Sequence, residues 1–176
     1  MRPEQGDRGA EGTASPVPPK PHPVVVERIT HADVPAICTL LKKVGDAQPA
    51  GLPAELLKAW QPAPLEFTSQ MEGVTYFAAR RDGRLIGAIG CEIRHGTCHL
   101  MVLAVDPETR RQGVASALLT AATEWAKRSN APSIWVDALA RFTPVASFLR
   151  RHGYSEAGAL HKHEWGEDIA LFERVL

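Results

Sequence analysis

One continuous stretch, from Leu100 to Leu119, constrains the fold of this chain more than any other. It begins with an apolar run, Leu100–Val105, that is long enough for a buried strand, and the run stops at Asp106-Pro107. A basic turn follows. The apolar side chains then take the spacing of one helical face, whose members are Val114, Leu118, Ala121, Ala122 and Trp125. The stretch therefore predicts a strand, a turn and a helix in immediate succession.

The start of that helix is a candidate anion site. A helix entered from a turn directs several unpaired backbone N–H groups, and the positive end of its dipole, at whatever lies in front of it. This arrangement suits a phosphate or diphosphate. Gly113 removes the Cβ that would hinder the anion, and Arg110 and Arg111 add positive charge. On spacing alone, an ordinary connection with both arginines in solvent explains the pattern equally well, because short glycine motifs are weak indicators.

The pattern around Gly113 also resembles a known signature. The acyl-CoA motif of the GNAT superfamily of N-acetyltransferases has the core Gln/Arg-x-x-Gly-x-Gly/Ala, and the matching stretch here is Val105-x-Pro107-x-x-Arg110-x-x-Gly113-x-Ala115. The similarity extends over nearly the whole of residues 24–176. It implies that acetyl-CoA is the cosubstrate and that no metal is needed. It also implies that the acetyl group passes by direct attack to a primary amine of a small molecule or peptide.

The resemblance further implies which residues bind the cofactor. In the family, backbone groups just before the turn pair with the pantetheine arm, and the turn with the first helical residues binds the diphosphate. The matching residues are Leu103, Ala104 and Val105 for the arm, and Arg110, Arg111, Gln112, Gly113, Val114, Ala115 and Ser116 for the diphosphate. Most of these contacts would use backbone N–H groups, so side-chain identity matters chiefly at Gly113 and Ala115.

Two side chains are candidates for the base that removes a proton from the amine. A lysine-like amine has a pKa near ~10.4, and a positioned base is worth roughly 10²–10⁴ in rate. His99 lies eleven residues before Arg110, near where some histone-type members of the family place a catalytic Glu, and an imidazole suits neutral pH. Glu92, on the preceding strand, is the alternative. Without a catalytic role, His99 hydrogen-bonds to a neighbour and Glu92 faces solvent.

The tyrosine that usually serves as the family's acid is missing. The segment from Phe142 to Tyr154 resembles the pattern Asn-x-x-Ala-x-x-x-Tyr-x-x-x-Gly-Phe, but Leu149 occupies the tyrosine position. A leaving thiol, with a pKa of about 8.5, needs less help than the amine. We therefore expect a working enzyme in which water or a donor such as Ser147 protonates the sulfur, or in which no acid is used. Loss of activity is the alternative.

The remaining patterns predict one α/β domain. Residues 1–23, rich in proline, glycine and charge, are expected to form a flexible tail, and residues 24–176 the N-acetyltransferase domain. The expected order is β-α-α-β-β-β-α-β-α-β-β, a GNAT-like mixed central sheet flanked by helices. Asp82-Gly83 predicts a hairpin, and residues 61–72, with two prolines, are expected to be irregular.

Charge and hydropathy argue against several classes of partner. The formal net charge is zero, so nothing in it favours nucleic acid or an anionic membrane. No apolar run reaches the about 18 residues of a membrane span, and no secretory signal is evident. The three cysteines suit reduced thiols. We expect a cytoplasmic monomer or homodimer. His161 and His163 share one strand face. A metal site there is conceivable, but no Cys pair or carboxylate spacing completes it, and lining the acceptor pocket is favoured over metal binding.

Two other functions fit the same motif. A chain that keeps the fold but lacks the tyrosine could be a non-catalytic acyl-CoA-binding or interaction domain. The same helix start could also serve a nucleotide- or phosphate-binding module. No motif in the sequence identifies the amine.

Overall fold

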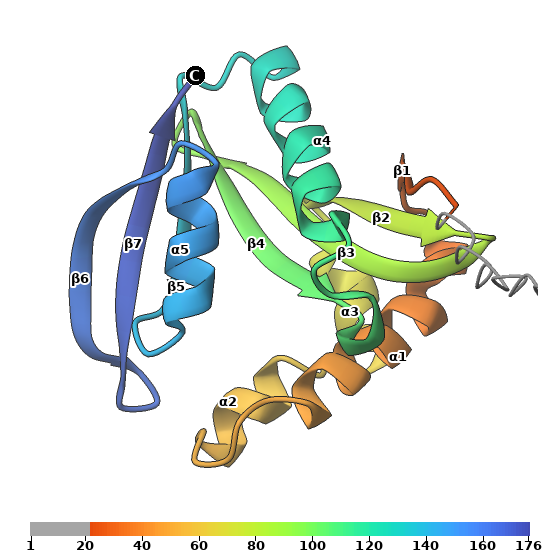
Figure 1. Cartoon of the computed structure of the whole chain (residues 1–176), viewed down its shortest axis with the longest axis horizontal. Coiled ribbons are helices and arrows are strands. Elements are labelled where there is room, and N and C mark those ends of the chain that lie inside the picture. The colour runs from red at the N-terminus through yellow and green to blue at the C-terminus, as the bar shows by residue number, and fades with distance from the viewer. Residues whose placement is uncertain (1–21) are drawn as a thin grey trace, which may run out of the picture.

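The computed structural model describes residues 22–176, and the expected flexible tail, residues 1–23, lies almost wholly outside them. The chain forms the predicted mixed α/β arrangement, with helices on both faces of one sheet (Figure 1). Its strands are β1 (Val25–Arg28), β2 (Thr75–Arg81), β3 (Arg84–Arg94), β4 (Thr97–Val105), β5 (Ser133–Leu139), β6 (Ser155–Glu164) and β7 (Glu167–Val175). Its helices are α1 (Val34–Asp46), α2 (Ala54–Ala59), α3 (Pro64–Gln70), α4 (Val114–Arg128) and α5 (Thr143–Arg151), with 3-10 turns η1 (His31–Asp33) and η2 (Pro107–Thr109).

The sheet opens in its middle. Its strands are ordered β1-β2-β3-β4-β5-β7-β6, and every neighbouring pair is antiparallel except β4 and β5. That parallel pair is short, because only Cys98–Leu100 and Ile134–Val136 are in register. Beyond it, β4 has only β3 as a neighbour and β5 has only β7. We call the space between the unpaired edges, residues 101–105 of β4 and 137–139 of β5, the β4–β5 opening.

Each face of the sheet packs against its own helices. Helices α4 and α5 cover the α4 face, through a core that includes Leu100, Leu118 and Leu149. Helices α1 and α3 cover the α1 face, whose core includes Ile37 and Phe67. Helix α2 packs across the ends of β5 and β7. None of these helices is long and apolar enough to cross a membrane.

The prediction that residues 61–72 are irregular is wrong, because α3 lies within them. Pro64 occupies the first helical turn, where its missing N–H costs nothing. The Ala63 backbone N–H donates to Glu66 Oε2 over 2.9 Å, which satisfies one of the unpaired groups at the helix start. Phe67 is fully buried and lies 4.8 Å from the Tyr76 ring, measured between centroids. A helix of seven residues with one buried aromatic side chain is too short to show a helical repeat in the sequence, so it could not be recognised there.

Candidate active site

The turn between β4 and α4 leaves the start of the helix open. Gly113 precedes α4 with φ of 82°, and Arg111 also has a positive φ, of 61°. Among residues 22–176, no side chain caps the first N–H groups of α4, and no other atom lies within 4 Å of the position that a Gly113 Cβ would take. Arg110, Arg111 and Gln112 are exposed. The geometry is that of an anion site made from backbone N–H groups.

Asp106 holds this turn to the rest of the domain. Its side chain is almost completely buried and accepts a hydrogen bond from the Glu108 N–H at 3.0 Å, which caps η2. Its carboxylate also meets Lys43 Nζ at 2.9 Å and an Arg84 nitrogen at 2.7 Å. Burial alone would raise the pKa of Asp106, but the hydrogen bonds from Lys43 and the Glu108 N–H hold it below the ordinary value. The turn is therefore anchored through an ionised carboxylate.

The edge of β4 leads from the opening to this turn. The register with β3 shifts between Ile89 and Cys91, so that Met101 and Val102 lie opposite the single residue Gly90. Such a bulge leaves backbone groups without a ladder partner and bends the strand. The predicted pantetheine residues, 103–105, follow the bulge on the unpaired edge, and residues 110–116 continue into α4. All ten predicted cofactor residues thus lie along one continuous path.

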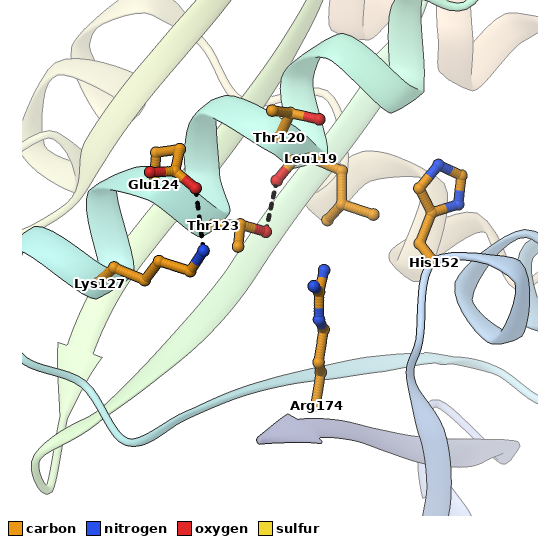
Figure 2. A pocket seen from close by; sticks show the side chains of 7 residues that line it. All are labelled: Leu119, Thr120, Thr123, Glu124, Lys127, His152 and Arg174. Carbon is orange, nitrogen blue, oxygen red and sulfur yellow. Dashed lines mark hydrogen bonds and ion pairs between the residues drawn. The ribbon is translucent and has the colours of Figure 1, made fainter. Parts of the chain in front are cut away.

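A contact that the sequence did not indicate lies beside the first turn of α4. His152 Nδ1 lies 2.9 Å from the Phe148 carbonyl oxygen, and His152 Nε2 lies 3.0 Å from Ser116 Oγ. Because a carbonyl can only accept, a neutral His152 carries its proton on Nδ1, and Ser116 donates to Nε2. His152 also borders a polar hollow of about 150 Å³ between α4 and β7, into which Arg174 points from β7 toward Thr123 and Leu119 of α4 (Figure 2). His152 therefore connects the predicted diphosphate residue Ser116 to that hollow.

The two predicted base residues, Glu92 and His99, lie opposite each other on β3 and β4, on the α1 face. The His99 ring stacks on Trp135 with a centroid distance of 3.7 Å, and its Nε2 lies 2.7 Å from Asp137 Oδ1. Burial would raise the pKa of Asp137, but the hydrogen bond from His99 lowers it below the ordinary value. Asp137 was not predicted, because its place beside His99 depends on the parallel pairing of β4 with β5.

Two buried polar atoms on this face lack a hydrogen-bond partner within residues 22–176, Tyr76 Oη and His99 Nδ1. Glu92 Oε2 forms an ion pair instead, 3.2 Å from an Arg94 nitrogen. Tyr76 pairs with Gly90, and its ring lies over that glycine, where a Cβ would come within 2.7 Å of it. Burial and the charge of Glu92 raise the pKa of Tyr76 to about 12. Buried polar atoms are normally paired, so Tyr76 Oη and His99 Nδ1 are candidates to contact an ordered water or a bound molecule.

Comparison with known proteins decides the family. Residues 43–154 match the model of the Acetyltransferase (GNAT) family. The chain belongs to this family. The predicted family and acyltransferase class are therefore confirmed, and no curated protein sequence matches the chain.

Solved GNAT structures share the fold at low sequence identity. The ribosomal-protein-S18-alanine N-acetyltransferase of Escherichia coli is 18% identical with a TM-score of 0.71, over 86% of this chain and 93% of that one. The PaiA N-acetyltransferase of Thermoplasma acidophilum, determined with coenzyme A, is 16% identical with a TM-score of 0.72, over 88% and 99%. The ribosomal-protein-alanine N-acetyltransferase of Brucella melitensis is 18% identical with a TM-score of 0.73, over 86% and 99%.

This GNAT protein departs from the family pattern at position 149, where Leu149 replaces the tyrosine that usually serves as the acid. Leu149 is 1% exposed and belongs to the core beneath α4 and α5. The tyrosine position is thus filled by a packing residue that has no proton to donate. Ser147, the alternative donor, is exposed on α5.

The histidines predicted to line the acceptor pocket, His161 and His163, are both exposed on β6. His161 Nδ1 lies 3.6 Å from Asp168 Oδ2. Among the residues that the structure describes, no three His, Cys, Asp or Glu side chains are grouped as metal ligands would be. His163 lies close enough to Asp137 and Glu164 to influence the pKa of both carboxyls.

Proposed function

We propose that the protein transfers the acetyl group of acetyl-CoA to a primary amine. The observation that carries the proposal is the continuous path from the unpaired edge of β4 through the Gly113 turn into the uncapped start of α4. The diphosphate is held by the N–H groups of the turn and first helical residues, 110–116. The pantetheine arm pairs with the backbone of residues 103–105, which brings the thioester into the β4–β5 opening.

The reaction is direct transfer between two bound molecules. The amine nitrogen attacks the thioester carbonyl carbon, a C–N bond forms and the C–S bond breaks. The departing thiolate of CoA takes up a proton from water or a nearby donor. The proton that the attacking nitrogen gives up goes to a base on the protein. Holding both reactants in line supplies much of the rate, so that no covalent enzyme intermediate is needed.

His99 is the proposed base, with Glu92 as the alternative. Asp137 accepts from Nε2, which fixes the neutral tautomer and leaves the lone pair of the ring on Nδ1. This nitrogen has no partner within residues 22–176. In this arrangement Asp137 is a positioning residue. Its removal should shift the pH profile of kcat and leave the KM for acetyl-CoA nearly unchanged.

The experiment combines binding and turnover. Calorimetric titration should show binding of acetyl-CoA, and a thiol-release assay against a panel of amines should show turnover with at least one of them. His99→Gln should lower kcat by about 10²-fold and abolish the acidic limb of the pH–rate profile. Asp137→Asn should displace that limb. An unchanged profile in His99→Gln contradicts the base, and absence of acetyl-CoA binding contradicts the whole proposal.

The burial of Leu149 favours a second candidate, a non-catalytic acyl-CoA-binding domain, because the position of the family's acid holds a core side chain. The same assays separate the two functions. Tight CoA binding without thiol release for any amine supports the non-catalytic domain. Thiol release supports the enzyme and indicates that the leaving thiolate needs no tyrosine.

A further inference from the structure

His152 immediately follows helix α5 and contacts the first turn of α4. Its Nδ1 lies 2.9 Å from the Phe148 carbonyl oxygen, which can only accept, so this nitrogen carries a proton in both charge states of the ring. Its Nε2 lies 3.0 Å from Ser116 Oγ. The His152 ring also packs against the Phe148 ring at a centroid distance of 4.3 Å. These contacts hold the imidazole in one orientation, in which only the proton at Nε2 can come and go.

Ser116 belongs to the predicted diphosphate site. It is the third residue of α4, and the first helical hydrogen bond runs from the next residue, Ala117 N–H, to the Gly113 carbonyl oxygen at 3.0 Å. The N–H groups of residues 114–116 therefore have no acceptor within the helix. Because side chains of a helix lean toward its N-terminus, the Ser116 hydroxyl lies beside the space that these N–H groups face.

The charge state of His152 decides what the Ser116 hydroxyl can offer to an anion. With a neutral ring, Nε2 accepts the hydroxyl proton, and Ser116 Oγ presents only lone pairs to a diphosphate oxygen. With a protonated ring, Nε2 donates to Ser116 Oγ, and the hydroxyl proton can turn toward the anion. The protonated ring also places a positive charge directly behind that hydroxyl. Both changes favour a bound anion, since hydrogen bonds that involve charged groups are the strong ones.

The charges around His152 leave it short of an anion. The charged side chains that line the same hollow or adjoin it in the sequence are Glu124 and Lys127 of α4, Arg174 of β7, and Arg150 and Arg151 of α5 (Figure 2). Glu124 and Lys127 pair at 3.1 Å, and Arg150 pairs with Glu156 of β6 at 2.6 Å. These two pairs cancel and leave two arginines. A further positive charge on His152 is unfavourable beside them until a negative charge is bound.

We infer that His152 is a positioning residue that couples CoA binding to the uptake of a proton. The proton enters at Nε2 when the diphosphate binds, and the Ser116 hydroxyl then donates to the anion. The inference rests on the proposed acetyl transfer, because it needs the diphosphate at the start of α4, and it adds a pH dependence to that site. Since histidine changes its charge between about pH 5 and 8, the binding of CoA should strengthen as the pH falls through this range.

Calorimetric titration with dephospho-CoA tests the coupling. This ligand keeps the diphosphate and lacks the 3′-phosphate, whose own ionisation near pH ~6 would add to the proton balance. Titrations at about pH 5.5 and pH 8 span the histidine range, and buffers of different ionisation enthalpy give the number of protons taken up. We expect roughly tenfold tighter binding at the lower pH, the range of one charge-assisted hydrogen bond, together with net proton uptake.

Three variants assign the effect. His152→Gln carries no titrating group, so the tenfold ratio of affinities should fall below about twofold and its proton uptake should vanish. Ser116→Ala keeps the charge of the ring and removes the hydroxyl, so the ratio should fall to about threefold. His31→Gln is the matched control, because His31 is exposed on η1, before α1. It should keep both the ratio and the uptake. A ratio that stays tenfold in His152→Gln, or falls equally in His31→Gln, contradicts the inference.

The outcomes separate this inference from the proposed function. If dephospho-CoA binds equally well at both pH values without proton uptake, the inference is wrong and the acetyltransferase stands. If acetyl-CoA binds and dephospho-CoA does not, the 3′-phosphate holds the cofactor in place of the diphosphate, and the inference is again wrong. If neither ligand binds at any pH, the proposed function fails with it.

Discussion

The two sides of the β4–β5 opening differ in the atoms that they present. The proposed cofactor side consists mainly of backbone N–H groups from one continuous segment, residues 103–116, with the helix dipole behind them. The proposed acceptor side consists of side chains from separate strands, among them Glu92 on β3, His99 on β4 and Asp137 on β5. A backbone site tolerates most side-chain changes, whereas each polar group on the acceptor side can be altered independently. The difference predicts that cofactor binding is the robust property and acceptor choice the variable one.

The largest expected effect is on the backbone site. Gly113→Val should weaken CoA binding by roughly a hundredfold, about 3 kcal/mol. A branched side chain is strained at a φ of 82° and covers the open N–H groups. Calorimetric titration measures the affinity.

The matched control is Gly96→Val, because Gly96 has a φ of 83° and equally open surroundings in the β3–β4 turn. It should cost similar strain and leave CoA binding intact. If both variants bind CoA normally, the assignment of CoA binding to the backbone around Gly113 is wrong.

The next largest effect is expected at Asp106, the buried carboxylate that anchors the turn before α4. Asp106→Asn should lower the free energy of unfolding at pH 7 by about 3 kcal/mol, because it removes the buried charge that faces Lys43 and Arg84. Urea denaturation of both proteins gives the difference.

The difference should also depend on pH. The pKa of Asp106 is lower when folded than its ordinary value of 3.8, so its stabilisation is present above that value. It is lost as the pH falls through the lower folded pKa. The two proteins should therefore approach equal stability in acid. A constant difference from pH 7 to pH 3 means that lost packing, and not charge, explains the effect.

On the acceptor side, Tyr76→Phe should separate stability from function. It removes a buried hydroxyl without a partner and should raise the free energy of unfolding by about 1 kcal/mol. It should also lower kcat/KM for the amine several-fold if the Tyr76 hydroxyl contacts the acceptor on the face that carries His99, the proposed base. Denaturation and steady-state kinetics are measured on the same preparation.

Tyr154→Phe is the matched control, because Tyr154 Oη is also buried without a hydrogen bond among residues 22–176, but lies in the core of the α4 face. It should be stabilising without any change in kcat/KM. A kinetic defect of the same size in both variants removes Tyr76 from the acceptor site.

The smallest expected effect concerns Glu164. Burial and the neighbouring charge of Asp137 raise the pKa of Glu164. Ionisation therefore costs stability as the pH rises from the unfolded pKa through the higher folded one. Glu164→Gln should raise Tm by roughly 1–2 °C at pH 7 and by less near pH 4, where the wild-type carboxyl is protonated. Scanning calorimetry at the two pH values tests this, and a higher Tm for the wild type at pH 7 contradicts an unpaired carboxylate.

Local signals predicted much of the fold. The Asp82-Gly83 hairpin is present, and both residues have positive φ, of 52° and 74°, as a tight turn between twisted strands requires. The strand, turn and helix from Leu100 onward are present as well. Helix α3 was missed because its stability comes from Phe67 packing on Tyr76, a contact with a strand that follows later in the chain.

The sequence by itself determined the strand, turn and helix start of the proposed cofactor path, because these elements belong to neighbouring residues. Only the tertiary structure decided the acceptor side. Asp137 meets His99 through the parallel pairing of β4 with β5. The spacing of residues along a chain carries the first kind of information. Strand order and register, set by the burial of the whole core, carry the second.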